Sequence, residues 1–432
     1  MLAMNYEQAM SYLKNLQFAY KKYDTKKIAA LLERRRRPQD SYRTVHVVGT
    51  NGKGSTTAFI AAGLQAAGFR VGMFTSPHLS DFRERFRVNG QKVTRKRLAS
   101  TLEKIIPDMQ SLDRNPFIGH PTYFETLVAM GLELFRELAV DFAVVEAGLG
   151  GRLDGTNIFS NTLPVLTNVG LEHTGILGRN LSAIALEKAA VVLPNSILFT
   201  GETRPRIIRL LEDECARRKA TLFPVAKRYR ISIREIAPGG MRFNVKGPGF
   251  QLANLVTPLL GRHQGKNALV ALAVLRHLGI TDPETLGRGF AAARWPGRLE
   301  IISGEPSFIL DGAHNPDGIR TLVRALNDLP FIFGKRIHCV FAALKDKKHR
   351  DVVRLLAPHI HQVIVTRPNT SRAAEPSLLA DVFRRHGCQN VTVEKEHGRA
   401  FKRARSEAAN DDIVLITGSL YLVGNLRPLI VT

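Results

Sequence analysis

One stretch constrains the fold of this chain more than any other, because an apolar strand runs directly into a glycine-rich turn and then a helix. Residues 45–57 read VHVVGTNGKGSTT, and the helix-forming run 58–67 follows them. Glycines let backbone N–H groups approach phosphate oxygens closely, and the N-terminus of a helix adds positive potential. The order of strand, loop, lysine and helix therefore predicts a phosphate-binding loop in an α/β domain.

The polar residues of this loop are of the types that nucleotide binding requires. Lys53 would reach the β- and γ-phosphates, and the hydroxyl of Ser55 or Thr56 would contact Mg²⁺. The spacing departs from the pattern G-x-x-x-x-G-K-[ST], since Gly54 separates Lys53 from Ser55. A glycine-rich turn without chemical function is the alternative, and the order of the elements disfavours it.

Composition indicates a globular chain with more than one domain. The 432 residues are 44% hydrophobic and 23% charged, which is ordinary for a soluble protein of two or three domains. No uncharged apolar run approaches the length of a membrane span, and the N-terminal residues lack the order of a signal peptide. The three cysteines are widely scattered, which favours a reducing compartment. We therefore expect a cytoplasmic protein without a membrane partner.

The chain is strongly basic, with 62 Lys and Arg residues against 38 Asp and Glu residues and a formal net charge of +24. The densest run is the arginine stretch at 34–37. Such charge can indicate nucleic-acid binding, but no aromatic-interleaved recognition module accompanies it. We favour a solvated basic surface that steers anionic ligands, and we expect no nucleic-acid partner.

Polar side chains stand where predicted strands end. Ser76, Glu146 and His173 each come shortly after an apolar stretch with the pattern of a strand. Open α/β sheets place ligands at the carboxyl ends of their strands, and in ATPases a carboxylate at such a tip binds Mg²⁺. A Glu146 carboxylate at the end of an apolar strand would cost free energy unless it had a partner, which favours a functional role. Ser76, in contrast, can be a turn residue, and His173 can be an ordinary loop histidine.

Two further segments have both a structural and a functional interpretation. Thr122 and Glu125 form the pattern of a helix capping box, and Tyr123 and Phe124 between them can be core residues. Lys188 adjoins an apolar run and can carry its charge to the surface past buried methylenes. At the level of single residues these interpretations stay open.

The pattern changes at 294–298, where RWPGR interrupts the helical periodicity. Beyond it, short apolar strands alternate with amphipathic helices, which predicts a second, smaller α/β domain with a mostly parallel sheet. Its first strand ends in the polar cluster DGAHNP at 311–316. We therefore divide the chain into an N-terminal domain, 1–297, and a C-terminal domain, 298–432.

Several motifs, taken in order along nearly the whole chain, resemble the folylpolyglutamate and dihydrofolate synthases of the Mur ligase superfamily. The seven motifs are GTNGKGST (49–56), SPHL (76–79), TYFE (122–125), EAGLGGRLD (146–154), EKA (187–189), PGR (296–298) and DGAHNP (311–316). The resemblance implies an α/β fold in which a P-loop ATPase domain of Mur ligase type precedes a smaller Rossmann-like ligase domain.

The resemblance also implies a role for each matching residue. The residues with catalytic roles would be Lys53, His173 and Lys188. Those at the ATP site would be Asn51, Gly52, Lys53, Gly54, Ser55, Thr56, Asn267, Arg298, Asp311 and His314. Those that bind Mg²⁺ would be Ser55, Ser76, Glu146, His173 and Lys188, the last as a carbamate. Those on the pterin side would be Thr122, Tyr123, Phe124, Glu125, Leu153, Asp154 and Gly155, with Phe124 available for stacking.

The implied reaction is the ATP-dependent addition of L-glutamate to a pterin or folate carboxylate through an acyl phosphate. The acceptor would be 7,8-dihydropteroate, a reduced folate or both, and the family makes a monomer the expectation. The cofactors would be ATP and Mg²⁺.

Two other functions are alternatives. A Mur-type cell-wall ligase carries a UDP-binding domain ahead of the ATPase domain, and fewer than about fifty residues precede the loop in this sequence. A regulatory P-loop NTPase with nucleic-acid affinity would suit the basic charge, but it gives no task to Lys188, Asp311 or His314. Both alternatives are therefore disfavoured.

The sequence departs from the family pattern at two places. Glu172 stands where the family commonly has Asp, which conserves the carboxylate beside His173. The run LKDKK at 344–348 ends in lysine where an Asp is usual, which changes the charge expected on the amino-acid side of the site.

Overall fold

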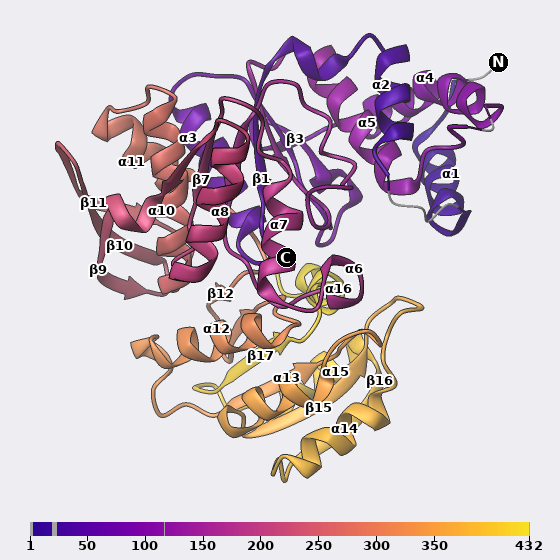
Figure 1. The fold of residues 1–432 in the computed structure, drawn as a ribbon. Coiled ribbons are helices and arrows are strands. Elements are labelled where there is room, and N and C mark those ends of the chain that lie inside the picture. Colours follow the sequence, from indigo (N-terminus) through magenta and orange to yellow (C-terminus); the bar gives the residue numbers. More distant parts are fainter. Residues whose placement is uncertain (1–2, 20–23, 116, 432) are drawn as a thin grey trace.

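The computed structural model describes residues 3–19, 24–115 and 117–431 (Figure 1). Within these ranges the strands form three sheets, of eight, three and six strands. The first two sheets and their helices make up the upper part of Figure 1, and the third sheet with its helices makes up the lower part. The expected α/β class, with a larger N-terminal and a smaller C-terminal unit, is confirmed.

The largest sheet consists of short strands that are buried at its centre. They are β1 (Arg43–Val48), β2 (Val71–Phe74), β3 (Phe86–Val88), β4 (Gln91–Lys92), β5 (Phe142–Glu146), β6 (Leu163–Leu166), β7 (Ile197–Thr200) and β8 (Thr221–Pro224). Their order is β4-β3-β2-β5-β1-β6-β7-β8, and all neighbours from β2 to β8 pair in parallel. The polar residues that follow β1, β2, β5 and β6 therefore meet at one edge of the sheet.

Helices cover both faces of this sheet. One face carries α3 (Lys53–Ala66), α10 (Arg262–His277) and α11 (Pro283–Ala292), which enclose the largest apolar core. The other face carries α1 (Tyr6–Ala19), α2 (Lys26–Arg34), α4 (Arg95–Asp113) and α5 (Tyr123–Glu137) in one cluster. A further cluster on that face contains α7 (Leu181–Ala189) and α8 (Pro205–Arg217), and two single-turn helices are α6 (Thr174–Leu177) and α9 (Val225–Arg228).

The start of α5 confirms the predicted capping box. Thr122 Oγ1 accepts a hydrogen bond from the Glu125 backbone N–H at 3.3 Å, and the Glu125 carboxylate accepts one from the Thr122 N–H at 2.6 Å. These two bonds satisfy backbone donors that have no partner inside the helix. The residue pattern therefore has a structural role, whatever else it does.

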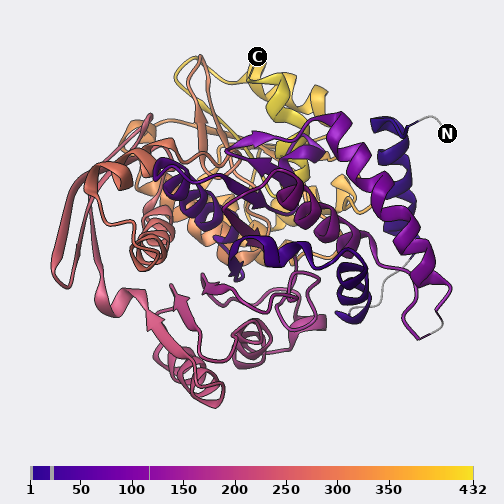
Figure 2. The same cartoon turned by 90° about the horizontal axis from the view of Figure 1, so that it is seen from above.

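The second sheet is a three-stranded antiparallel unit. Its strands are β9 (Arg230–Ala237), β10 (Gly240–Gly247) and β11 (Phe250–Thr257). One face packs against α10 and α11, with Met241 and Phe243 fully buried there. In both ribbon views this sheet lies at the opposite end of the N-terminal unit from α1 and α4 (Figures 1 and 2).

The third sheet forms the centre of the C-terminal unit. Its strands are β12 (Glu300–Ile302), β13 (Ser307–Leu310), β14 (Ile337–Phe341), β15 (Gln362–Arg367), β16 (Val391–Glu396) and β17 (Ile413–Thr417). The order is β12-β13-β17-β14-β15-β16, and only β12 pairs antiparallel. One face carries α12 (Pro316–Asn327), α13 (His349–Leu356) and α14 (Pro376–Arg385), and the other carries α15 (His397–Glu407) and α16 (Leu420–Leu426).

Across the part of the chain that the structure describes, no helix is both long and apolar enough to span a membrane.

Candidate active site

The loop between β1 and α3 has a conformation that requires glycine at two positions. Gly49 and Gly52 have φ angles of +151° and +81°. A Cβ atom on Gly49 would overlap the hydroxyl of Thr167, and one on Gly52 would come within 2.5 Å of Asn267 Oδ1. The loop therefore lies close against the end of β6 and the first turns of α10, in a backbone region that other residues rarely adopt.

Hydrogen bonds from the residues after β6 fix this loop. The Asn51 N–H donates to Asn168 Oδ1 at 3.0 Å, and the Asn51 carbonyl accepts from Thr167 Oγ1 at 2.7 Å and from Asn168 Nδ2 at 2.9 Å. Asn51 is thus held on both sides of its peptide. These bonds place the start of α3, and with it Lys53, at the edge of the sheet.

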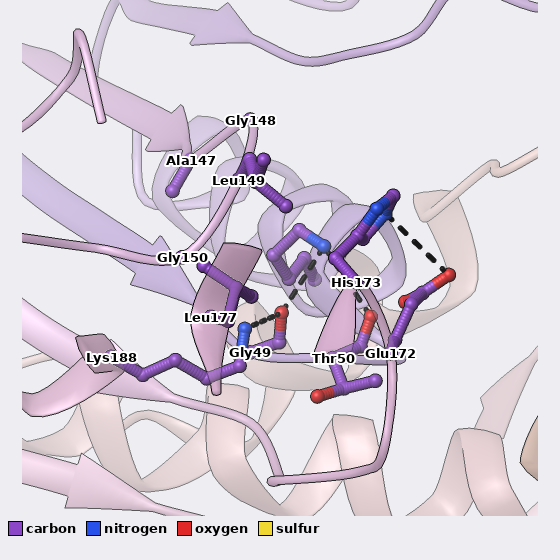
Figure 3. Close-up of a pocket in the computed structure, with 11 residues that line it drawn as sticks. Gly49, Thr50, Ala147, Gly148, Leu149, Gly150, Glu172, His173, Leu177 and Lys188 are labelled. Carbon is purple, nitrogen blue, oxygen red and sulfur yellow. Dashed lines mark hydrogen bonds and ion pairs between the residues drawn. The ribbon is translucent and has the colours of Figure 1, made fainter. Parts of the chain in front are cut away.

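Two lysines from distant parts of the chain converge on the Gly49 carbonyl. Lys188 Nζ donates to Gly49 O at 2.9 Å, and Lys53 Nζ donates to the same oxygen at 3.2 Å and to Thr50 O at 3.4 Å. Figure 3 shows Lys188 extending from α7 to this carbonyl. Lys188 is 3% exposed, and burial, followed by the positive charge of Lys53, lowers its pKa to about 7.

These lysines lie in a first cavity that also contains His173 (Figure 3). Residues 147–150 after β5 form its opposite wall. His173 immediately precedes α6 with a φ of +49°, and burial lowers the pKa of its imidazole. A neutral imidazole, and a lysine whose lowered pKa leaves part of it neutral, are groups beside the phosphate-binding loop that can ligate a metal or accept a proton.

A second cavity lies on the side of β2 and contains Ser76 and Glu146. Glu146 ends β5, is 5% exposed and accepts a hydrogen bond from the Ser76 N–H at 3.2 Å. Burial raises the pKa of Glu146, and the charges of Lys53, Arg298 and Arg85 oppose that rise. Glu146 is therefore a buried carboxylate whose nearest charges are all positive.

The predicted Mg²⁺ ligands divide between these two cavities, with Ser76 and Glu146 in one and His173 and Lys188 in the other. No group of three or more His, Cys, Asp or Glu side chains that could hold a metal ion occurs among the described residues. Mg²⁺ usually takes one or two carboxylates and completes its shell with water and substrate phosphates. The residues present fit that mode of binding, with Glu146 as the protein carboxylate.

Asn267, which the resemblance implies at the ATP site, lies beside the loop. Asn267 Nδ2 donates to Gln264 Oε1 at 2.9 Å, and the Asn267 amide faces Gly52. The ring of Trp295 closes over Gly54, where a Cβ atom would clash with it. Asn267 is thus adjacent to the phosphate-binding turn, and Trp295 is a neighbour that the sequence did not indicate.

The two predicted pterin-side segments are in contact. The ring of Phe124 lies against Gly148 and Gly155, so that a Cβ atom on Gly148 would come within 2.5 Å of Phe124 Cζ. Leu153 is 48% exposed and available to a ligand. The Asp154 carboxylate, in contrast, accepts hydrogen bonds from the Leu149 and Thr156 N–H groups at 2.5 and 3.0 Å and from the Thr156 hydroxyl at 2.5 Å. Asp154 therefore shapes the loop that walls the first cavity.

An ionic cluster joins the C-terminal unit to this site. Glu172 Oε1 lies 3.2 Å from His314 Nε2 and 3.4 Å from Lys347 Nζ. Burial would raise the pKa of Glu172, but the hydrogen bond from His314 and the nearby positive charges hold it well below its usual range. Asp311, also predicted, is 8% exposed and accepts from the Leu299 and Ala313 N–H groups, each at 2.8 Å. The sequence predicted Asp311 and His314 at the ATP site, but it did not indicate that His314 pairs with Glu172.

Two cations near the site were not predicted individually as site residues, although the run that contains Lys347 was expected on the amino-acid side of the site. Lys347 lies in the LKDKK run, and Arg85 follows β2 in FRERFR. Arg85 is 7% exposed, and its Nε donates to His78 Nδ1 at 3.0 Å. Burial lowers the pKa of Arg85. The one sequence feature that could have indicated the burial of Arg85 is its position between phenylalanines in the run 82–87.

Comparison with known proteins gives a consistent result. The family model for the Mur ligase middle domain matches residues 47–275, and that for the Mur ligase, glutamate ligase domain, matches residues 297–420. The chain is 34% identical over 404 residues to the dihydrofolate synthase/folylpolyglutamate synthase of Bacillus subtilis, covering 92% of each chain.

Solved structures match over the whole length. A Mycobacterium tuberculosis folylpolyglutamate synthase complexed with ADP has a TM-score of 0.92 at 30% identity, covering 99% of both chains. A bifunctional folylpolyglutamate synthase/dihydrofolate synthase with Mn, AMPPNP and L-glutamate bound has a TM-score of 0.85 at 28% identity, covering 98% of both chains.

The ionic cluster yields a prediction about stability. Glu172→Gln and Lys347→Met should each lower the thermal midpoint, and the double variant should lose less than the sum, because a coupled pair is lost only once. A hydrogen bond to a charged group contributes about 1.5–3 kcal/mol. Since the pKa of Glu172 lies below its ordinary value of 4.5, its contribution should be complete above that pH and decline as the pH falls below it. If the decreases in thermal midpoint of the two single variants added exactly in the double variant at neutral pH, the coupling between Glu172 and Lys347 would be contradicted.

Proposed function

The chain belongs to the folylpolyglutamate synthase/dihydrofolate synthase family of Mur ligases, and from this premise we propose that its two cavities form one active site centred on Lys53. The protein is an ATP-dependent ligase that adds L-glutamate to a pterin or folate carboxylate. One observation carries the proposal about the site. Lys53 shares the Gly49 carbonyl with Lys188 in the first cavity, and its charge is the largest that acts on Glu146 in the second.

The reaction needs a positive charge beside the phosphoryl group that is transferred. A carboxylate is a poor electrophile, so the γ-phosphoryl group of ATP is first transferred to the acceptor carboxylate, which gives an acyl phosphate and ADP. The amine of glutamate then attacks the acyl carbon, an amide forms, and phosphate leaves with the former carboxylate oxygen. Lys53 stabilises the charge that develops on the transferred phosphoryl group, and the glycine-bounded loop holds the phosphates in line.

ATP and a divalent metal ion are the cofactors, and we propose Mg²⁺ as that ion, as the phosphate chemistry favours. When bound, it neutralises phosphate charge and holds the β- and γ-oxygens in place. Ser55, Ser76, Glu146, His173 and Lys188 are the residues that would hold it. Asn51, Gly52, Gly54, Thr56 and Asn267 would complete the nucleotide site on the N-terminal side.

Lys188 suits modification by carbon dioxide. Its amine is buried, donates to a carbonyl and has no carboxylate partner among the described residues. With a pKa near 7, much of it is neutral at physiological pH, and the neutral amine attacks CO₂ and releases a proton to form a carbamate. The product would put a second anionic group, besides Glu172, in the cavity that contains His173.

The C-terminal unit supplies the remaining contacts. We propose that residues 298–432 act as the domain that closes on the bound nucleotide through Arg298, Asp311 and His314. The cluster of Glu172, His314 and Lys347 links the two units on the side of the first cavity. Closure excludes water that would otherwise hydrolyse the acyl phosphate.

The acceptor side is formed by the segments around Phe124 and Leu153. The Phe124 ring, bordered by Gly148 and Gly155, offers a flat apolar surface of the kind on which a pterin stacks. We propose that both dihydropteroate and reduced folate bind there, since the Bacillus subtilis relative bears both activities in its name. We further propose that the enzyme acts as a cytoplasmic monomer without a nucleic-acid partner, which agrees with its small-molecule site.

The first test removes the central charges. Lys53→Ala and Glu146→Ala should fold with near wild-type thermal midpoints and lose glutamate-dependent ADP release by roughly 100-fold or more, as loss of one transition-state charge contact does. Arg83→Met, outside both cavities, serves as the matched control. Full activity in either variant would contradict the proposed site.

The second test addresses the acceptor. ADP release with glutamate should be seen with 7,8-dihydropteroate and with tetrahydrofolate, and Phe124→Ala should raise the KM of both, because one stacking surface serves both. Activity with a single acceptor would contradict the bifunctional assignment.

The third test addresses Lys188. Protein equilibrated with isotopically labelled bicarbonate above neutral pH should carry one labelled carbamate, detected by NMR, and Lys188→Met should abolish the signal. The signal should fade as the pH drops through about 7, since the amine becomes protonated. Label that persists in Lys188→Met, or its absence from the wild type, would refute the modification.

A further inference from the structure

An arginine that the mechanism does not use lines the second cavity. Arg87 is the middle residue of β3, which pairs antiparallel with β2 so that Arg87 lies opposite Met73. It therefore lies next to the strand whose end carries Thr75 and Ser76. The far wall of the cavity comes from Trp295, Arg298 and Leu420, so that residues of both units line it.

The guanidinium group of Arg87 has an unused donor within the described chain. Among the described residues it forms no ion pair, and its Nε is buried without a hydrogen-bond partner. The nearest acids are engaged elsewhere, because Glu84 accepts from the Leu79 N–H at 2.7 Å and Asp81 pairs with Arg83 at 2.7 Å. Burial lowers the pKa of Arg87, and the charges of Glu84 and Asp81 oppose that shift without forming an ion pair with it.

Two neighbouring arginines, unlike Arg87, form ion pairs with acidic residues. Arg83 is paired with Asp81, and Arg427 forms a two-pronged contact with Glu300 at 2.7 and 2.8 Å. Arg87 and Arg298, the two guanidinium groups in the cavity, have no such partner within the described chain. Glu146 and Glu84 also line the cavity, and the charge of Arg298 acts on Glu146. Arg87 is thus the guanidinium group of the cavity that has neither an ion pair within the described chain nor a use in the proposed mechanism.

A guanidinium group presents parallel N–H donors that match the two oxygens of a carboxylate. A glutamyl group has two carboxylates when free and at least one when attached to a folate. We propose that Arg87 binds a carboxylate of a glutamyl group in the second cavity and so determines specificity for that substrate. This inference rests on the proposed function, because it assumes that the amide forms beside Glu146.

Two sources of this carboxylate share the same chemistry. One is the free L-glutamate that attacks the acyl phosphate, and the other is the glutamyl end of a folate acceptor. Dihydropteroate carries no glutamyl group, so the two acceptors separate the sources. Free glutamate would involve Arg87 with either acceptor, whereas a folate tail would involve it with tetrahydrofolate alone.

The test compares Arg87→Met, Arg87→Lys and the control Arg83→Met in steady-state assays of the full-length enzyme with both acceptors. Loss of a charge-assisted hydrogen bond should raise a KM roughly 10- to 100-fold. With free glutamate as the ligand, Arg87→Met raises the KM of glutamate with both acceptors and leaves that of ATP unchanged. With the folate tail as the ligand, only the KM of tetrahydrofolate rises.

The KM values of Arg87→Lys should fall between those of Arg87→Met and the wild type, because lysine keeps the charge but lacks the parallel N–H donors of the guanidinium group. Thermal midpoints confirm that the variants are folded, which is expected since Arg87 makes no ion pair. Wild-type KM values for glutamate and both acceptors in Arg87→Met would overturn the inference. A wild-type enzyme without glutamate-dependent ADP release would instead contradict the proposed function, and the inference would fall with it.

Discussion

The convergence of Lys53 and Lys188 on the Gly49 carbonyl is the interaction on which the rest of the site depends. It ties the start of α3 to the end of α7 across the edge of the large sheet. Two ammonium groups on one oxygen repel each other, and burial adds to the cost of the second charge. Burial and the charge of Lys53 together lower the pKa of Lys188 to about 7. A bound phosphate group, or the carbamate proposed at Lys188, would offset this positive charge.

Charged side chains also form contacts between the N-terminal and C-terminal units. Glu172 is the carboxylate that draws His314 and Lys347 of the C-terminal unit toward the first cavity. In the second cavity the charge of Arg298, from the other unit, acts on Glu146, and Arg87 lines the same cavity without an ion pair in the described chain. The interface is thus held by charges that lie next to the reacting groups. Binding of an anionic substrate and closure of the two units should therefore reinforce each other.

Sequence alone predicted the elements whose signals are local. The strand at β1, the capping box at Thr122 and the alternation of strands and helices after residue 298 follow from apolar periodicity and turn chemistry. Because parallel strands bring their ends together, Ser76, Glu146 and His173 could be grouped without a structure. Their division between two cavities could not be predicted, since it depends on which side of Lys53 each loop lies. The pairing of Glu172 with Lys347 and the isolation of Arg87 depend on contacts between distant segments, so they required coordinates.

The central claim is that one site, organised by Lys53, activates the acceptor carboxylate by phosphoryl transfer. Heavy-oxygen labelling of that carboxylate tests it most directly, because the bond that breaks when glutamate attacks leaves one carboxylate oxygen on phosphate. Mass spectrometry of the phosphate released during turnover with labelled dihydropteroate should find one heavy oxygen per product formed. Unlabelled phosphate in the presence of full amide formation would contradict the acyl-phosphate route and the role assigned to Lys53.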